Sequence, residues 1–237
     1  MAEKEKNRCG FLSTVKVTGT GMLRLTPDTT RIDITLHGPE KEYADAVRRS
    51  AEDTEALKDL LEKLGFARNE LKTLNFRVDP RYESYQEDQI YRQRLIGYEF
   101  YHSMKIEFPS DNAFLGRVLY ALANSKLTPE FSLSYTVKDK EASKNKLIGA
   151  AVKDAKAKAK VLAKASGVEL GRVLSINYSM AEPDFVVRPM AKMMMARNES
   201  ADMAGGYNID IEPESIQVSD TVTIVWTIRH KEEQGEQ

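Results

Sequence analysis

The sequence AAVKDAKAKAKVLAKASGVELG, residues 150–171, decides the fold more than any other part of this chain. Alanine occupies every fourth position, at Ala151, Ala155, Ala159 and Ala163, and several of the positions between them are lysines. Residues four apart lie on one face of an α-helix, so the stretch predicts a helix with one small-residue face and one charged face. Because alanine has no bulk beyond Cβ, we expect this helix to lie unusually close to the layer that covers it.

The segments around this helix contain several strands, because their apolar and polar residues alternate. Residues 31–36 alternate cleanly, and we expect them to form an opening hairpin with the strand-like residues 13–25. Two later runs, residues 94–108 and 216–228, are longer than ordinary strands. We expect these two long strands to pair, with a bulge or a local exit from the core at Asp220, which interrupts the apolar face of the last one.

Two further helices complete the expected fold. One begins at Gly38-Pro39, since proline is tolerated in the first helical turn, and ends at Gly65. The other follows Ser110 as its capping residue, and the alanine-rich helix runs from about residue 140 to 166. An antiparallel or mixed sheet with three helices packed on one face hides the apolar sides of all these elements, which predicts an α+β fold with two long strands.

Length and composition indicate one globular domain with no strong electrostatic field from its net charge. The 237 residues carry 35 Lys and Arg against 36 Asp and Glu, so nothing steers the chain to nucleic acid. The chain has no apolar run of about 18 residues, and no integral membrane segment is expected. We expect a single domain over residues 13–229, between a flexible segment 1–12 and a tail 230–237, with a mobile methionine-rich loop at 181–207.

The N-terminal segment predicts a cytoplasmic protein. Residues 1–10 are polar and charged, and Phe11-Leu12 is far too short for the apolar core of a signal peptide. The single cysteine, Cys9, excludes an intramolecular disulfide and is compatible with a reducing compartment.

Several short motifs occur along the chain in a characteristic order. They are Val17-x-Gly19-x-Gly21, Pro27-Asp28, Pro80-x-Tyr82, Gly97-Tyr98, Leu115-Gly116-x-Val118-Leu119, the alanine-rich helix with Gly167 and Leu170-Gly171, and Ile211-x-Pro213-x-x-Ile216-x-Val218. In these motifs the chain resembles the SIMPL-domain family over nearly its whole length. The resemblance implies poorly defined biochemistry, an association with envelope integrity and oxidative stress, and, in some relatives, large ring- or channel-like homo-oligomers. Many relatives carry a secretory signal.

No catalytic, metal or cofactor site is predicted from the residues. The histidines His37, His102 and His230 are scattered without metal-site spacing, and Gly19-x-Gly21 lacks the third glycine of a dinucleotide cradle. No serine stands in a nucleophile-elbow motif. We therefore predict a non-enzyme without a cofactor, in which His102 is a hydrogen-bonded core or interface residue.

Two groups of residues form the candidate interaction surface. The first is the methionine cluster of a non-periodic segment: Met190, Met193, Met194, Met195 and Met203. Thioethers form adaptable apolar surfaces and also bind Cu(I), and we favour a loop that orders on assembly over a copper site. The second is a connection between strands in which Tyr82, Tyr85 and Tyr91 alternate with arginines and acidic residues. Single-stranded nucleic acid is a minor alternative for it.

Two functions from different classes follow. The preferred one is a non-enzymatic, self-associating protein with a stress- or envelope-related role implied by the resemblance. The alternative is a cytosolic binding module or adaptor, which holds a protein or small ligand through the methionine-rich loop or the tyrosine- and arginine-containing connection. An enzyme would need titratable residues brought together by the fold.

Overall fold

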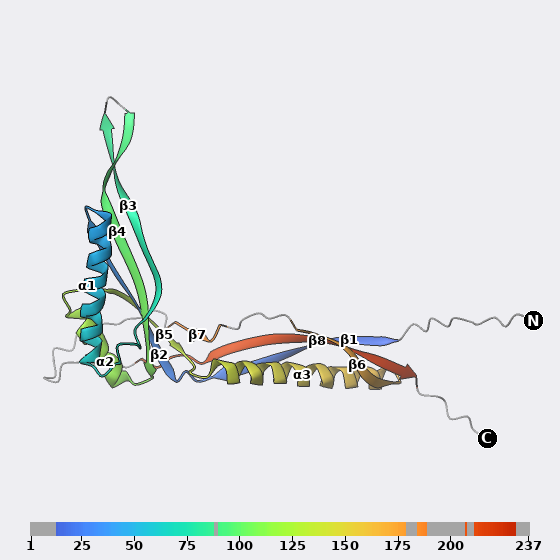
Figure 1. Ribbon diagram of the computed structural model, residues 1–237. Helices are drawn as coiled ribbons and strands as arrows, with labels where there is room; N and C mark the ends of the chain where they lie inside the picture. Colours follow the sequence, from blue (N-terminus) through green and yellow to red (C-terminus); the bar gives the residue numbers. More distant parts are fainter. Residues whose placement is uncertain (1–12, 88–89, 179–183, 189–206, 208–210, 231–237) are drawn as a thin grey trace, which may run out of the picture. The chain divides into compact units, whose positions relative to one another are not determined.

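The computed structural model describes residues 13–87, 90–178, 184–188, 207 and 211–230 (Figure 1). Within them there are three helices and eight strands, and the strands form two antiparallel sheets, which confirms the α+β class. The chain divides into two compact units. Of the described residues, 13–25, 139–178, 184–185 and 216–230 form the alanine-helix unit, and 26–87, 90–138, 186–188, 207 and 211–215 form the hairpin unit. The expected single domain stays a prediction, which one cooperative unfolding transition would support.

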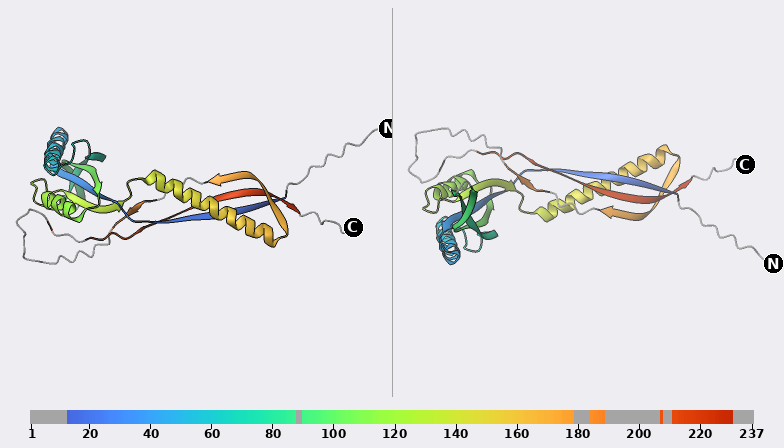
Figure 2. Two further views of the ribbon diagram at one scale, coloured as in Figure 1. Left: turned by 90° about the horizontal axis from the view of Figure 1, so that it is seen from below. Right: turned by 90° about the horizontal axis from the view of Figure 1, so that it is seen from above.

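The alanine-helix unit is a three-stranded sheet with one long helix along it (Figure 2). Strand β8 (Ile216–His230) lies in the centre, between β1 (Thr14–Leu25) and β6 (Val168–Tyr178). Helix α3 (Lys140–Ala165) begins after Asp139, whose side chain accepts a hydrogen bond from the Ala142 N–H at 2.8 Å. This bond satisfies one of the free amides at the start of the helix.

Helix α3 and strand β1 touch backbone to backbone. A Cβ added to Gly19 would lie 2.2 Å from the Ala151 carbonyl oxygen and 2.3 Å from the Ala155 nitrogen, and one added to Gly21 would lie 2.2 Å from the Leu147 oxygen. Ala151 and Ala155 are fully buried. The expected close approach is confirmed. The glycines on the strand have no side chain and the alanines on the helix have only a Cβ, so the two backbones can come into contact.

The hairpin unit is a five-stranded sheet with two helices. Its strand order is β3 (Lys72–Glu87), β4 (Ile90–Pro109), β2 (Thr29–Glu40), β5 (Glu130–Thr136) and β7 (Val186–Val187). Helices α1 (Tyr43–Glu62) and α2 (Asn112–Ala123) share one core with this sheet. That core contains Ile32, Ile34, Leu36, Leu57, Leu61, Phe100, Met104, Ile106, Leu115, Val118 and Leu122.

Three expectations about strand pairing are wrong. The strands divide into two sheets, so α3 covers a sheet of its own instead of sharing one face with α1 and α2. Strands β1 and β2 form no opening hairpin, since β1 pairs with β8 and β2 with β4 and β5. The long strands β4 and β8 do not pair with each other. The glycines on one face of β1 leave room for the alanine-rich helix. The large apolar residues on one face of β2 are instead buried in the core of the hairpin unit.

The expected bulge or local exit from the core at Asp220 is also wrong. Strand β8 stays in register with β1 there, and Asp220 lies opposite Gly21. Its side chain is only 8% exposed, and it accepts a hydrogen bond from the Tyr178 hydroxyl at 2.7 Å. This hydrogen bond raises the pKa of Tyr178, so the phenol keeps its proton and the carboxylate keeps a donor.

Two helix starts differ from the sequence prediction. Gly38 and Pro39 continue strand β2 and pair with β4, so α1 begins only at Tyr43. Helix α2 is capped by Asp111 and not by Ser110, because the Asp111 carboxylate accepts hydrogen bonds from two amides of the first turn at 2.9 and 3.2 Å. A carboxylate also interacts favourably with the helix dipole.

Candidate interaction surface on the β3–β4 hairpin

The outer part of the β3–β4 hairpin extends beyond the five-stranded sheet (Figure 1). Strand β2 pairs with β4 only as far as Tyr98, so the residues of β4 before it pair, among the described strands, with β3 alone. We call residues 81–87 and 90–97 the distal ribbon. The sequence predicts an exposed connection between strands here; the structure continues both strands through it, and only residues 88–89 at the tip lie outside the described part.

A bulge lies at the base of the distal ribbon. Arg81 pairs with Gly97 but Tyr82 pairs with Leu95, so Ile96 is an extra residue on β4. Gly97 has a φ of +146°, and a Cβ there would lie 2.3 Å from the Glu40 carbonyl oxygen at the end of β2. Only glycine fits both the conformation and the contact, and the bulge changes the twist where the third strand ends.

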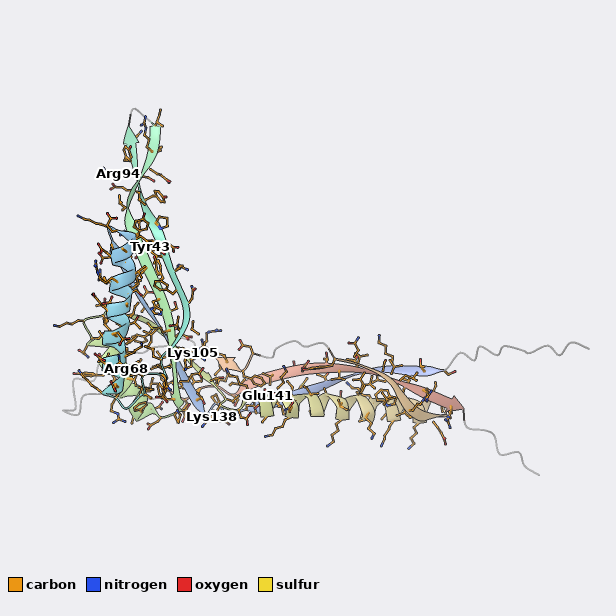
Figure 3. All side chains as sticks on the ribbon, in the orientation of Figure 1. Tyr43, Arg68, Arg94, Lys105, Lys138 and Glu141 are labelled. Carbon is orange, nitrogen blue, oxygen red and sulfur yellow. The ribbon has the colours of Figure 1, made fainter. Side chains whose placement is uncertain are left out.

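One face of the distal ribbon carries charges that satisfy one another. Glu83 lies opposite Arg94, and its carboxylate accepts hydrogen bonds from the Arg94 Nε and Nη2 at 2.9 and 2.6 Å. The Arg94 guanidinium also lies 5.8 Å from the centre of the Tyr85 ring. Figure 3 labels Arg94 on the ribbon, beyond Tyr43 at the start of α1. We call this the charged face.

The other face of the distal ribbon has no charged side chain. Successive side chains of a strand point to opposite faces, so the residues beside Glu83 and Tyr85 point away from Arg94. Together with the residues paired to them, they form what we call the uncharged face: Tyr82, Ser84, Gln86, Tyr91, Gln93 and Leu95. Its largest side chains are exposed, at 57% for Tyr82, 49% for Leu95 and 80% for Tyr91.

The structure therefore brings together three of the residues proposed for interaction. Tyr82 and Tyr91 lie on the uncharged face and Tyr85 on the charged face of the same ribbon. The five methionines, Met190, Met193, Met194, Met195 and Met203, lie outside the described residues. Within the predicted loop 181–207, Val186 and Val187 form strand β7 beside β5.

His102 is a structural residue that joins α1 to the sheet. The Thr54 hydroxyl donates to the Ser50 carbonyl at 2.6 Å, so it accepts from the His102 Nδ1–H at 3.0 Å. The Nε2 then accepts from the Thr73 hydroxyl at 2.9 Å. Burial, and to a smaller extent Lys58, lowers the pKa of His102, so the ring is neutral near pH 7. The predicted hydrogen-bonded histidine is confirmed.

A second histidine lies in a polar cluster that the sequence does not reveal. His37 on β2 lies 3.4 Å from Glu99 through Nδ1 and 3.4 Å from Glu130 through Nε2. Its ring stacks on the Tyr101 ring with the two centres 5.8 Å apart, and the Arg77 guanidinium lies 4.5 Å from the centre of the Tyr101 ring. Burial, followed by Glu99, raises the pKa of Tyr101. These residues meet only through strand register, which no local motif encodes.

The described residues show no metal site. No group of three or more His, Cys, Asp or Glu side chains among them could hold a metal ion. A hollow of about 450 Å³ is lined by Met22, Leu23, Arg24, Gln217, Val218 and Ser219, and Arg24 is its one titratable side chain. A lone guanidinium supplies no acid–base pair. In the described part, no helix combines the length and the apolar character needed to cross a membrane.

Comparison with known proteins identifies relatives of undefined activity. The family model SIMPL, described as a protein of unknown function (DUF541), matches residues 15–226. The 26 kDa periplasmic immunogenic protein of Brucella melitensis is 26% identical over 207 residues, which cover 83% of this chain and 82% of the relative. The uncharacterized protein YggE of Escherichia coli K12 is 24% identical over 220 residues, which cover 93% and 85%. These names state no catalytic activity, and the Brucella name places that protein in the periplasm, which gives no support to the cytoplasmic prediction.

Proposed function

Because this chain belongs to the SIMPL family, we propose that it is a non-enzymatic protein that associates with further copies of itself. The observation that carries the proposal is the distal ribbon, whose large side chains are exposed on a two-stranded element. An isolated two-stranded ribbon is marginally stable in water, and burying exposed aromatic area on association is favourable. A partner that covers the ribbon would therefore stabilise it.

The non-enzymatic part is supported by the bonding of the His102 ring. His102 is held between hydroxyl groups in its neutral form, and His37 is flanked by Glu99 and Glu130. A general base needs access to a substrate proton, and an activated nucleophile needs a base beside it. The bonds made by His102 serve the packing of the hairpin unit instead, whereas His37, with a side chain that is 35% exposed, adds no support to this point.

Light scattering after gel filtration tests self-association directly. We expect a mass that is a multiple of 26.8 kDa across micromolar concentrations. A strict monomer over that range contradicts the proposal.

A variant of the ribbon then tests its location. Replacing Tyr82, Tyr91 and Leu95 with serine should lower the average mass, because the exposed apolar area of the ribbon is removed. The matched control is Val161→Ser, which removes a side chain that is 67% exposed on α3. An unchanged mass for the triple variant, with an intact circular dichroism spectrum, would remove the ribbon from the proposal.

The alternative function is a binding module for a protein or small ligand. It is favoured by the charged face of the ribbon, where Arg94 lies near Tyr85, since arginine and tyrosine are enriched at protein interfaces. The methionine-rich loop remains a second proposed contact. A monomeric protein that forms a complex of defined stoichiometry with a purified partner, and loses it on Arg94→Ala, would establish this alternative.

The cellular role is proposed from the family alone. A stress- or envelope-related role stays a prediction, and so does the cytoplasmic location. Fractionation of cells that express the native gene would decide between the cytoplasm and the periplasm named for the Brucella relative. Recovery of the chain with periplasmic markers would overturn the cytoplasmic prediction.

A further inference from the structure

We infer that the uncharged face of the distal ribbon pairs with the same face of a second copy across a two-fold axis. This inference rests on the self-association proposed above and adds which face is used and how the copies are related. It follows from three properties of the ribbon: its charge distribution, its composition and the order of its side chains.

The charge distribution selects the face. On the charged face, Glu83 and Arg94 satisfy each other within one chain. The uncharged face has no charged side chain that would need a counter-charge or lose its hydration on burial. A face without charge is matched best by another face without charge, and a second copy supplies one.

The composition suits a protein interface. Two tyrosines and a leucine provide the apolar area, and Ser84, Gln86 and Gln93 provide both donors and acceptors of hydrogen bonds. Tyrosine contributes a large contact area and loses little side-chain freedom. A hydroxyl or an amide can also bond to its own copy, which a lysine or a glutamate cannot do without repulsion.

The order of the side chains is symmetric about its middle pair. Along the face, the pair Tyr82/Leu95 comes first, Ser84/Gln93 second and Gln86/Tyr91 last. Successive pairs are about 7 Å apart, at roughly 3.4 Å per strand residue. Large side chains thus stand at both ends, and the smallest stands in the middle.

A two-fold axis that runs across the strands at the middle pair places the first pair of one copy over the last pair of the other. Rotation about that axis stacks the ribbons in opposite directions, with each strand over its own copy. Leu95 then faces Tyr91 of the second copy, Tyr82 faces Gln86, and Ser84 faces Ser84. The rest of each hairpin unit then lies at the opposite end of the stacked ribbons from its copy. The contact is isologous, because the same patch is used on both chains.

Charge reversal at Ser84 tests this arrangement. Ser84→Lys and Ser84→Glu each place two like charges against one another at the axis, and each should weaken association by about tenfold or more, since like charges at an interface are strongly unfavourable. An equal mixture of the two variants should recover the wild-type mass, because each lysine then faces a glutamate. Glu83→Gln, on the charged face, is the control and should leave the mass unchanged.

Cross-linking supplies an independent readout. In a background with Cys9→Ser, which removes the one native cysteine, Ser84→Cys should be joined between copies by a short bis-maleimide reagent, and Glu83→Cys should not. Self-association without cross-linking at Ser84, or without recovery in the mixed variants, overturns the two-fold pairing and leaves the proposed function standing. A wild-type chain that is monomeric by light scattering overturns both.

Discussion

The alanine-helix unit and the distal ribbon use side-chain size in opposite ways. In the alanine-helix unit, Gly19 and Gly21 lie against the backbone of α3, and no additional atom fits between them. In the ribbon, Tyr82 and Tyr91 extend into solvent and touch little of their own chain. Substitutions that add atoms in the first region should therefore lower the free energy of unfolding. Substitutions that remove atoms in the second should weaken association and leave the free energy of unfolding almost unchanged.

The largest effect is expected where an atom is added at Gly19. Gly19→Val places methyl groups where the Ala151 carbonyl oxygen lies, so α3 has to move away from β1. We expect a loss of at least about 3 kcal/mol in the free energy of unfolding, measured by urea denaturation.

Gly149→Ala is the matched control for this prediction. A Cβ at Gly149 would meet nothing within 4 Å, and alanine favours the helix by about 0.5–1 kcal/mol over glycine. An equal loss in both variants would show that the contact between α3 and β1 is not the cause.

A pH-dependent effect between pH 7.5 and 5.5 is expected in the hairpin unit. Burial lowers the pKa of His102 below its ordinary value of 6.5, so the unfolded chain takes up this proton first as the pH falls. The stability that His102 contributes is thus complete above about pH 6.5 and is lost as the pH falls below it. Thermal melts between pH 7.5 and 5.5 should show this decline.

His102→Gln is the control that isolates this residue from the other titrating groups. Glutamine can hydrogen-bond to hydroxyl groups but does not titrate, so the decline between pH 7.5 and 5.5 should become shallower. A decline of equal slope in the variant would assign the pH dependence to other residues.

A smaller effect is expected at Tyr135, whose hydroxyl is buried without a hydrogen-bond partner among the described residues. Burial also raises the pKa of this tyrosine, so the group stays neutral. Tyr135→Phe removes the unsatisfied hydroxyl, and we expect an unchanged or higher stability, by up to about 1 kcal/mol in urea denaturation. A clear loss would indicate that the hydroxyl has a partner in the folded protein.

The smallest effect on unfolding is expected in the ribbon. Replacing Tyr82, Tyr91 and Leu95 with serine should change the free energy of unfolding by no more than about 0.5 kcal/mol at protein concentrations low enough for monomers. A loss comparable to that of Gly19→Val would show that the ribbon belongs to the core of its unit, and would end the contrast drawn between the two regions.

The close packing of α3 could be predicted because its cause is local. Four alanines at every fourth position give the helix one face of small side chains. That Gly19 and Gly21 of β1 lie against this face came only from the structure. The partners of the strands could not be predicted in the same way. Strand β1 pairs with β8 at the other end of the sequence, and alternation of apolar residues says which face is buried but not which strand lies beside it.

The ribbon was predicted as a connection because it lacks an apolar face that alternates with a polar one. Tyr82, Ser84 and Gln86 alternate with Glu83 and Tyr85, and both sets are polar enough to resemble a loop. The candidate residues Tyr82, Tyr85 and Tyr91 could be selected by type. Their division between two faces required the register with β4 and the bulge at Gly97.

The pairing of β1 with β8 has a consequence for synthesis on the ribosome. Strand β8 spans 15 residues near the carboxyl end of the chain, so β1 emerges long before its central partner does. The continuous segment 26–138 of the hairpin unit can form most of its core while translation proceeds. Until β8 is made, the backbone N–H and C=O groups of the nascent β1 that will bond to it are unpaired, so β1 is the part of the chain that a chaperone would have to protect.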